Sequence, residues 1–280
     1  MIWDGVPQPP PRPLTWRDRL RVARRGVPMA TVVFGGLLVL LALRLIERPV
    51  YGLRRPFTPW ITQAVCRAAL AILGLRRDVR GAPMRGTGAT VANHASWLDI
   101  FTLNASERIY FVSKSEVADW PGIGWLARAT GTIFIRRDRR EARSQTEMFE
   151  ARLKAGHRLM FFPEGTSTDG IRVLPFKTTL FAAFFSADLP AMRVQPVTLA
   201  YHAPEGAPAT FYGWWGDHGF GAHLLRMLAW PRHGTVELIY HTPLQLADYS
   251  DRKSLARAAE AAVRAGLRAS GRLSVDAPPR

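Results

Sequence analysis

From about residue 87 onward, the chain alternates short runs of β-branched and aromatic residues with segments whose apolar residues recur at helical spacing. The short runs predict strands at residues 89–93, 109–113, 132–136, 158–163, 193–201, 209–213 and 235–241. The longer segments predict helices at residues 139–154, 178–187, 221–230 and 252–269. Such an alternation is typical of an α/β domain with a mostly buried sheet flanked by helices.

The first 80 residues follow a different pattern. Residues 27–43 carry no charge, and as a helix they would extend about 26 Å, which is borderline for crossing a bilayer. Arginines crowd both flanks, so the positive charges give no orientation, and a crossing helix and one that dips into a single leaflet both stay open. The alternative is a buried core helix. A second apolar segment at residues 64–75 favours membrane contact.

These patterns divide the chain into four parts. Residues 1–26 are rich in proline and arginine and predict an extended arm on the membrane surface or in solvent. Membrane-associated helices are expected at residues 27–80, the α/β domain at 81–270 and a short tail at 271–280.

The charge of the chain predicts a polyanionic partner. Formal net charge is +16 and the isoelectric point is about 11.2, which suits either nucleic acid or an anionic membrane surface. The single cysteine, Cys66, excludes an internal disulfide framework and fits a reducing compartment. A nucleic-acid-binding protein leaves the uncharged N-terminal segment unexplained, so we favour the membrane and expect no nucleic acid.

The first candidate for chemistry follows the strand predicted at residues 89–93. That strand delivers His94 to a turn, Ser96 can cap the next helix, and Asp99 falls in its first turn. From there the carboxylate can reach one ring nitrogen of His94, fix the tautomer and raise the basicity of the other nitrogen. No G-x-S-x-G elbow supplies a serine nucleophile, so the base would activate a hydroxyl of the substrate. The alternative is a solvated loop without a function.

Two further stretches place polar groups at strand ends. Glu164 and Gly165 follow a very apolar strand, where a carboxylate can bind a ligand hydroxyl and glycine allows close backbone approach; an ordinary strand-to-loop turn is the alternative. Arg136 and Arg137 end another apolar run and suit phosphate, whereas the arginines that follow them predict a solvated helix face. Pro196 lies inside a strand-like run and points to an edge, a bulge or a shaped wall.

Together, the stretches NHASWLD, GTIFIRR, FPEGT and VQPVTLAY resemble, in this order, the four motif blocks of the glycerolipid acyltransferases, over residues 87–200. The resemblance implies a single membrane-tethered α/β acyltransferase domain with His94 as general base and Asp99 as its orienting partner. It also implies that Arg136 or Arg137, with Glu164 and Gly165, binds the head group of the acceptor. The remaining motif positions are Thr166, expected beside the acceptor, and the supporting residues Asn93, Ser96, Lys177 and Pro196.

The resemblance implies a lysophospholipid acceptor, a thioester of CoA or acyl carrier protein as donor, no further cofactor, and a site on the cytoplasmic face of the cell membrane. Two positions depart from the family pattern. Ser167 stands where many members carry arginine, and no glycine follows Phe176-Lys177 closely. Lysophosphatidate is therefore the first acceptor considered, and lyso-ornithine lipid or another lysolipid is the alternative.

Other candidate sites are weaker. His218 and His223 lack a third ligand at useful spacing, so we predict no metal site. A scaffold with this fold but no activity is a further alternative, which an acyl-transfer assay would distinguish from an enzyme.

Overall fold

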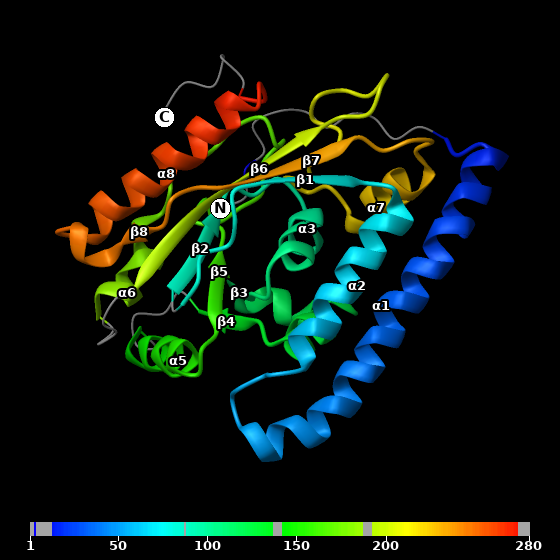
Figure 1. Cartoon of the computed structure of the whole chain (residues 1–280). Coiled ribbons are helices and arrows are strands. Elements are labelled where there is room, and N and C mark those ends of the chain that lie inside the picture. The colour runs from blue at the N-terminus through cyan, green and yellow to red at the C-terminus, as the bar shows by residue number, and fades with distance from the viewer. Residues whose placement is uncertain (1–2, 4–12, 87, 137–141, 187–191, 274–280) are drawn as a thin grey trace.

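The computed structural model describes residues 3, 13–86, 88–136, 142–186 and 192–273, and its centre is one mixed sheet (Figure 1). The strands lie in the order β1-β7-β6-β2-β5-β3-β4, and β8 pairs with β6. Their bounds are β1 Arg76–Arg80, β2 Gly88–Ala92, β3 Tyr110–Lys114, β4 Ile133–Ile135, β5 Arg158–Phe161, β6 Arg193–His202, β7 Thr235–Tyr240 and β8 Leu244–Gln245.

The strands β6, β2, β5, β3 and β4 run parallel to one another, while β7 and β8 run antiparallel to β6. Parallel neighbours end at the same edge of the sheet, so the residues that follow β2, β5, β3 and β4 share one edge. All five residues of β2 are buried, as expected for a strand covered on both faces. The predicted α/β class with a buried mixed sheet is confirmed.

Pro196 does not mark an edge strand. It lies in β6, between β2 and β7 in the sheet, with Val91 of β2 as its partner in register. On its other side, β6 pairs with β8 at Arg193 and Val194 and with β7 only from Val197 onward. Pro196 therefore falls where β6 changes partner, a position that tolerates the missing N–H.

One strand prediction is wrong, and two strands were not predicted. Residues 209–213 form turns, closed by bonds from Phe211 N to Pro208 O and from Gly213 N to Thr210 O, both 2.9 Å. Strand β1 was not predicted, because an exposed edge strand does not need alternating apolar residues. It pairs with β7, so the sheet begins before residue 81, inside the segment that we expected to be helical. Strand β8 has only two residues, which is too short for a recognisable alternation of apolar and polar residues in the sequence.

Helices cover both faces of the sheet (Figure 1). The helices α2 Thr58–Leu73, α3 Leu98–Ser106 and α7 Phe220–Ala229 contribute to one core, and α5 Ala142–Lys154, α6 Ala182–Ser186 and α8 Arg252–Ala269 lie on the opposite side. The prediction at residues 252–269 is confirmed, and Asp251 caps that helix. The segment at 178–187 begins as a 3₁₀ helix, Thr178–Phe181, and the helix α4 Ile123–Thr130 was not predicted.

The helix α1 spans Trp16–Tyr51 and packs along the outer side of α2 (Figure 1). Residues 16–26 belong to this helix and do not form the extended arm that we expected there. Thr15 and Asp18 form a reciprocal cap, so the helix begins at Trp16 although arginines follow in its first turns. The helix is long and apolar enough to cross a membrane: an 18-residue window has mean hydropathy 2.3, and only 11% of it is buried.

Candidate active site

Most of the residues singled out in the sequence gather at one edge of the sheet. His94 follows β2, Glu164 follows β5 and Arg136 follows β4. These strands are parallel, as is β3, which lies between β5 and β4. Their carboxyl ends therefore meet at one edge, which is where ligands bind in open parallel sheets. Arg137 lies outside the described residues.

The His94 and Asp99 side chains are in direct contact. His94 Nδ1 lies 2.7 Å from Asp99 Oδ2, as the five-residue spacing predicted. The same oxygen accepts the backbone N–H groups of Ala95, at 2.8 Å, and Ser96, at 3.0 Å. Asp99 is fully buried in the first turn of α3, and Ser96 Oγ accepts from Leu98 N at 3.3 Å. These donors hold the Asp99 carboxylate in place.

Tyr201 completes this network from β6, and sequence reasoning missed it. Its hydroxyl donates to Asp99 Oδ1 at 2.7 Å, and its side chain is buried. Burial and the adjacent Asp99 raise the pKa of Tyr201 well above its ordinary value, so the hydroxyl keeps its proton and stays a donor. The only sequence signal was a tyrosine at the end of the proline block, 102 positions from Asp99.

The Asp99 carboxylate fixes the tautomer of the His94 ring. Because a carboxylate oxygen accepts the bond from Nδ1, the ring proton lies on Nδ1 and Nε2 is the basic nitrogen. The ring stacks on Phe162, with centroids 3.9 Å apart and an interplanar angle of 7°. The side chain of His94 remains 19% exposed, so a substrate hydroxyl can approach it. An oriented imidazole of this kind can act as a general base.

Glu164 holds the backbone around His94. Its Oε1 accepts from His94 N at 2.8 Å and its Oε2 from Leu174 N at 2.6 Å. The side chain is 1% exposed, and burial raises its pKa to about 8 despite these two N–H donors. This geometry differs from the expected contact with the acceptor, because both oxygens already bind backbone amides.

The loop after Glu164 depends on a glycine. Gly165 has φ +70°, and a Cβ placed there would lie 2.7 Å from Lys177 Nζ. Lys177 also donates its backbone N–H to Pro163 O at 2.9 Å, which closes the loop. Thr166 Oγ1 accepts from the backbone N–H of Trp3 at 3.4 Å. Trp3 therefore contacts this loop, and does not lie away from the domain as part of an arm.

Asn93 joins the two strands on which the network depends. Its amide donates to Leu199 O at 2.9 Å and accepts from Leu199 N at 2.8 Å. Because Leu199 is in β6, this pair of bonds holds the end of β2 against the strand that carries Tyr201. The expected supporting position of Asn93 thus has a structural basis.

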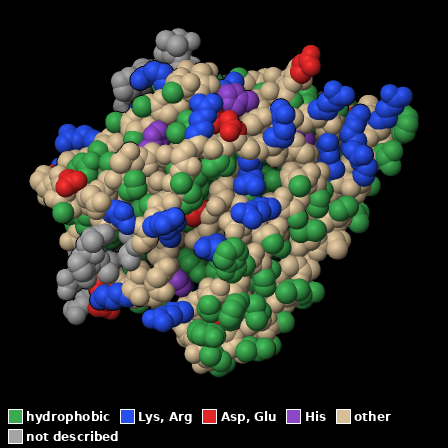
Figure 2. Space-filling model, in the orientation of Figure 1, with side chains coloured by type: hydrophobic (Ala, Val, Ile, Leu, Met, Phe, Trp, Pro, Cys, Tyr) green, Lys and Arg blue, Asp and Glu red, His purple; other side chains and the backbone are tan. Residues whose placement is uncertain are grey.

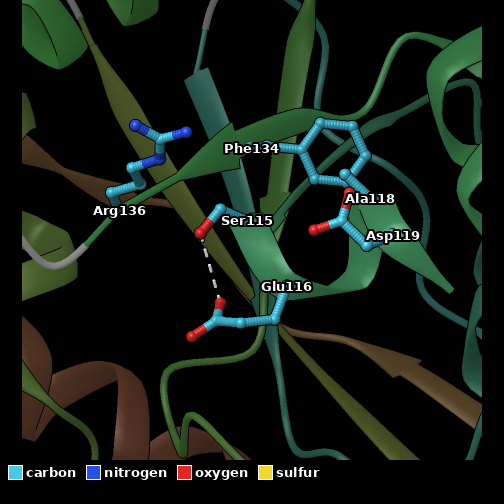
Figure 3. A pocket seen from close by; sticks show the side chains of 6 residues that line it. All are labelled: Ser115, Glu116, Ala118, Asp119, Phe134 and Arg136. Atoms are coloured by element: carbon cyan, nitrogen blue, oxygen red, sulfur yellow. Dashed lines mark hydrogen bonds between the residues drawn. The ribbon is translucent and has the colours of Figure 1, made fainter.

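Arg136 lines a pocket at the same edge. The pocket has a volume of about 550 Å³ and lies between β4 and the 3₁₀ helix Ser115–Asp119. Figure 3 shows Arg136 on one side of it and Glu116 and Asp119 on another. The sheet order puts β4 three strands from β2, so the pocket lies about 10–15 Å from the strand that leads to His94.

Comparison with known proteins decides the family. The Acyltransferase family model matches residues 77–200. Over 267 residues, the chain is 60% identical to the lyso-ornithine lipid O-acyltransferase of Rhodobacter capsulatus, with 95% of this chain and 97% of the relative covered. This chain belongs to the acyltransferase family. It is 32% identical to a 1-acyl-sn-glycerol-3-phosphate acyltransferase of Neisseria gonorrhoeae, with 72% and 78% covered.

The fold of this acyltransferase matches a solved structure. The crystal structure of the 1-acyl-sn-glycerophosphate acyltransferase of Thermotoga maritima superposes with a TM-score of 0.65. The match covers 91% of this chain and 96% of that chain at 21% identity.

In this acyltransferase, Ser167 stands where we expected an arginine for the head group. The next arginine along the chain, Arg172, already has partners. Arg172 binds Asp169 with its Nε at 3.0 Å from both carboxylate oxygens. Its guanidinium also lies 4.9 Å from the ring of Trp3. Arg172 therefore stabilises the loop.

His223 is a structural residue of the acyltransferase. Its Nδ1 accepts from Trp97 Nε1 at 2.9 Å and its Nε2 lies 3.0 Å from Gly213 O, so both nitrogens are occupied. Among the described residues, no group of three His, Cys, Asp or Glu side chains is placed to hold a metal ion.

Proposed function

We propose that this acyltransferase moves a fatty acyl group from a thioester of CoA or acyl carrier protein onto the free hydroxyl of lyso-ornithine lipid. The observation that carries the reaction is the contact of His94 Nδ1 with Asp99 Oδ2, which leaves Nε2 as a base at an accessible strand end. The acceptor rests on the relatives, because 60% identity to a lyso-ornithine lipid enzyme outweighs 32% identity to a lysophosphatidate enzyme.

The chemistry follows from the tautomer of His94. Nε2 takes the proton of the lipid hydroxyl while its oxygen attacks the thioester carbonyl carbon. The tetrahedral oxyanion collapses, the carbon–sulfur bond breaks, and the leaving thiolate takes the proton back from the imidazolium. Asp99 stabilises the imidazolium through its contact with Nδ1. The products are the acylated lipid and a free thiol, and no acyl-enzyme is required.

The location of the reaction is part of the proposal. The helix α1 exposes an apolar surface long enough for a membrane, and both the acceptor and the product are lipids. A chain with one buried cysteine suits the reducing cytoplasmic side. We therefore place the reaction on the cytoplasmic face of the membrane, whose anionic surface matches the positive net charge.

Lysophosphatidate is a second candidate acceptor. Arg136 at the catalytic edge suits phosphate, and the Neisseria gonorrhoeae relative acts on this class of lipid by its name.

An acceptor panel tests the proposal. The wild type in detergent is expected to acylate lyso-ornithine lipid with a higher kcat/KM than lysophosphatidate, and His94→Ala is expected to lose at least about a hundredfold on both. His202→Ala is the matched control, because that ring pairs with Glu237 of β7 and not with Asp99. Equal rates in the wild type and His94→Ala would refute the catalytic proposal, and a preference for lysophosphatidate would refute the acceptor.

A further inference from the structure

A second pocket opens on the opposite edge of the sheet from His94. It has a volume of about 720 Å³, within the range of small-ligand sites. Its walls include Arg108 and Tyr110 at the start of β3, His157 and Arg158 at the start of β5, and the connection between α1 and α2. Because strands begin at this edge, the pocket is separate from the catalytic site.

The lining of this basic pocket is strongly cationic. Five arginines and a single carboxylate line it: Arg54, Arg55, Arg67, Arg108 and Arg158, with Glu107. Glu107 already pairs with Arg158. Arg55 and Arg67 donate to backbone carbonyls, of Ala129 at 2.7 Å and of Ala105 at 2.8 Å, and a carbonyl does not neutralise their charge. The pocket therefore keeps an excess of positive charge at neutral pH.

The buried histidine in the basic pocket responds to that charge. His157 is 3% exposed and stacks on Tyr110, with ring centroids 4.0 Å apart. Burial, together with the charges of Arg152 and Arg55, lowers the pKa of His157 to about 3. His157 is therefore neutral at the pH of the cell, and the local potential suits an anion rather than another cation.

The basic pocket borders an apolar surface. The guanidinium of Arg108 lies 3.8 Å from the ring centroid of Trp60, which is 56% exposed. Leu53 and Phe57, in the α1–α2 connection, are also exposed. Figure 2 shows hydrophobic side chains gathered over this end of the hairpin, with Lys and Arg side chains beside them. An exposed tryptophan between apolar and cationic side chains is typical of a membrane interface.

We propose that the basic pocket binds the phosphate-bearing head group of an anionic membrane lipid while the end of the α1–α2 hairpin enters the bilayer. Guanidinium groups bind phosphate oxygens through paired hydrogen bonds, and several of them converge here. The bound lipid is neither acceptor nor product, because His94 lies at the other edge. The site holds the enzyme on anionic membranes independently of acyl transfer.

Vesicle binding of the full chain tests this site. We compare phosphatidylcholine vesicles with vesicles containing equal parts of phosphatidylcholine and phosphatidylglycerol, and expect the wild type to prefer the second. The double variant Arg54→Gln/Arg108→Gln removes two exposed charges of the basic pocket and is expected to lose about thirty-fold in that preference. Arg54→Lys/Arg108→Lys keeps the charges and is expected to retain most of it.

The control removes the same charge elsewhere. Arg257 and Arg268 are exposed on α8, away from the hairpin (Figure 1). Arg257→Gln/Arg268→Gln is expected to bind like the wild type, and all variants are expected to keep the same melting temperature. Equal losses in both glutamine pairs would show a general charge effect and overturn the site, as would unchanged binding of the Arg54 and Arg108 pair.

A competition experiment distinguishes binding of a membrane lipid from binding of free phosphate. Inorganic phosphate at matched ionic strength is expected to displace the wild type from the phosphatidylglycerol vesicles only weakly, because the apolar hairpin adds to binding only at a membrane. Strong competition by inorganic phosphate, with no preference for anionic vesicles, would overturn the lipid assignment.

Discussion

At the scale of single residues, Asp99 determines what His94 can do. The carboxylate accepts from the imidazole, from two backbone amides and from Tyr201. Each donor fixes an oxygen in place, so the carboxylate cannot turn away from the ring. The result is one tautomer of His94, in a side chain that is 19% exposed.

Replacing Asp99 with asparagine should separate geometry from charge. Asp99→Asn keeps the shape, but its NH₂ group must face either the Tyr201 hydroxyl or the amides of Ala95 and Ser96, and the imidazolium loses its counter-charge. We expect kcat to fall about a thousandfold with little change in KM. Asp248→Asn, at an exposed position, is the control. A rate within tenfold of the wild type would contradict the orienting role.

Glu164 predicts a pH dependence of stability. Its pKa in the folded chain is about 8, raised by burial from an ordinary value of 4.5. The folded chain then binds more protons than the unfolded chain, so the stabilising contribution is complete below pH 4.5 and is lost as the pH rises toward 8. Urea unfolding of the wild type and of Glu164→Gln, which cannot titrate, should show a stability difference that shrinks over that range. A constant or growing difference would contradict this assignment.

At this scale, contacts between residues close in the sequence were predictable, and contacts between distant residues were not. The His94 and Asp99 contact was predictable, because five residues across a turn into a helix leave little freedom. Tyr201 was not, since its partner is 102 positions away. Glu164 was placed at the correct edge, but its bonds to His94 N and Leu174 N were not predicted, because they depend on how two loops meet.

At the scale of elements, Glu47 joins the two helices of the hairpin. Its carboxylate is buried at the start of α2, where it accepts from Phe57 N at 2.8 Å, Thr58 N at 3.1 Å and Thr58 Oγ1 at 2.7 Å. Arg44 donates to it from one turn earlier in α1. A side chain of α1 thus satisfies the free amides at the first turn of α2.

Removing this cap should loosen the hairpin. Glu47→Ala leaves two amides, of Phe57 and Thr58, and the buried Thr58 hydroxyl without their acceptor, and we expect a loss of about 3 kcal/mol in the free energy of unfolding. For a chain of this size the melting temperature should fall by about 6–12 °C. Glu205→Ala, at an exposed loop position, should melt like the wild type. If Glu47→Ala melts at the same temperature as this control, the cap does not stabilise the hairpin.

Elements with strong periodicity were predicted well, and those defined by partners were not. The helix at residues 252–269 agrees with the structure at both ends, because its apolar face and its Asp251 cap are local. The strand at Arg76–Arg80 depends on pairing with β7, and the turns at residues 209–213 depend on local hydrogen bonds that override an aromatic run.

At the scale of the whole molecule, positive charge and apolar surface lie side by side at the end of the α1–α2 hairpin. The net charge of +16 predicted a polyanionic partner but not its position. The structure brings five arginines into the basic pocket, although they are spread from Arg54 to Arg158 along the chain. The His94 edge and the basic pocket lie at opposite ends of the strands, so variants in the pocket can test the proposed membrane attachment without changing the His94 site.

Thiol release without an acceptor lipid tests the central claim most directly. The donor thioester is mixed with the wild type, and free thiol is measured before and after addition of lyso-ornithine lipid. If His94 activates the hydroxyl of the lipid, no thiol equivalent to the enzyme appears before the lipid is added, and steady release follows its addition. A burst of one thiol per enzyme in the absence of lipid, with the acyl group bound covalently to the chain, would contradict the account.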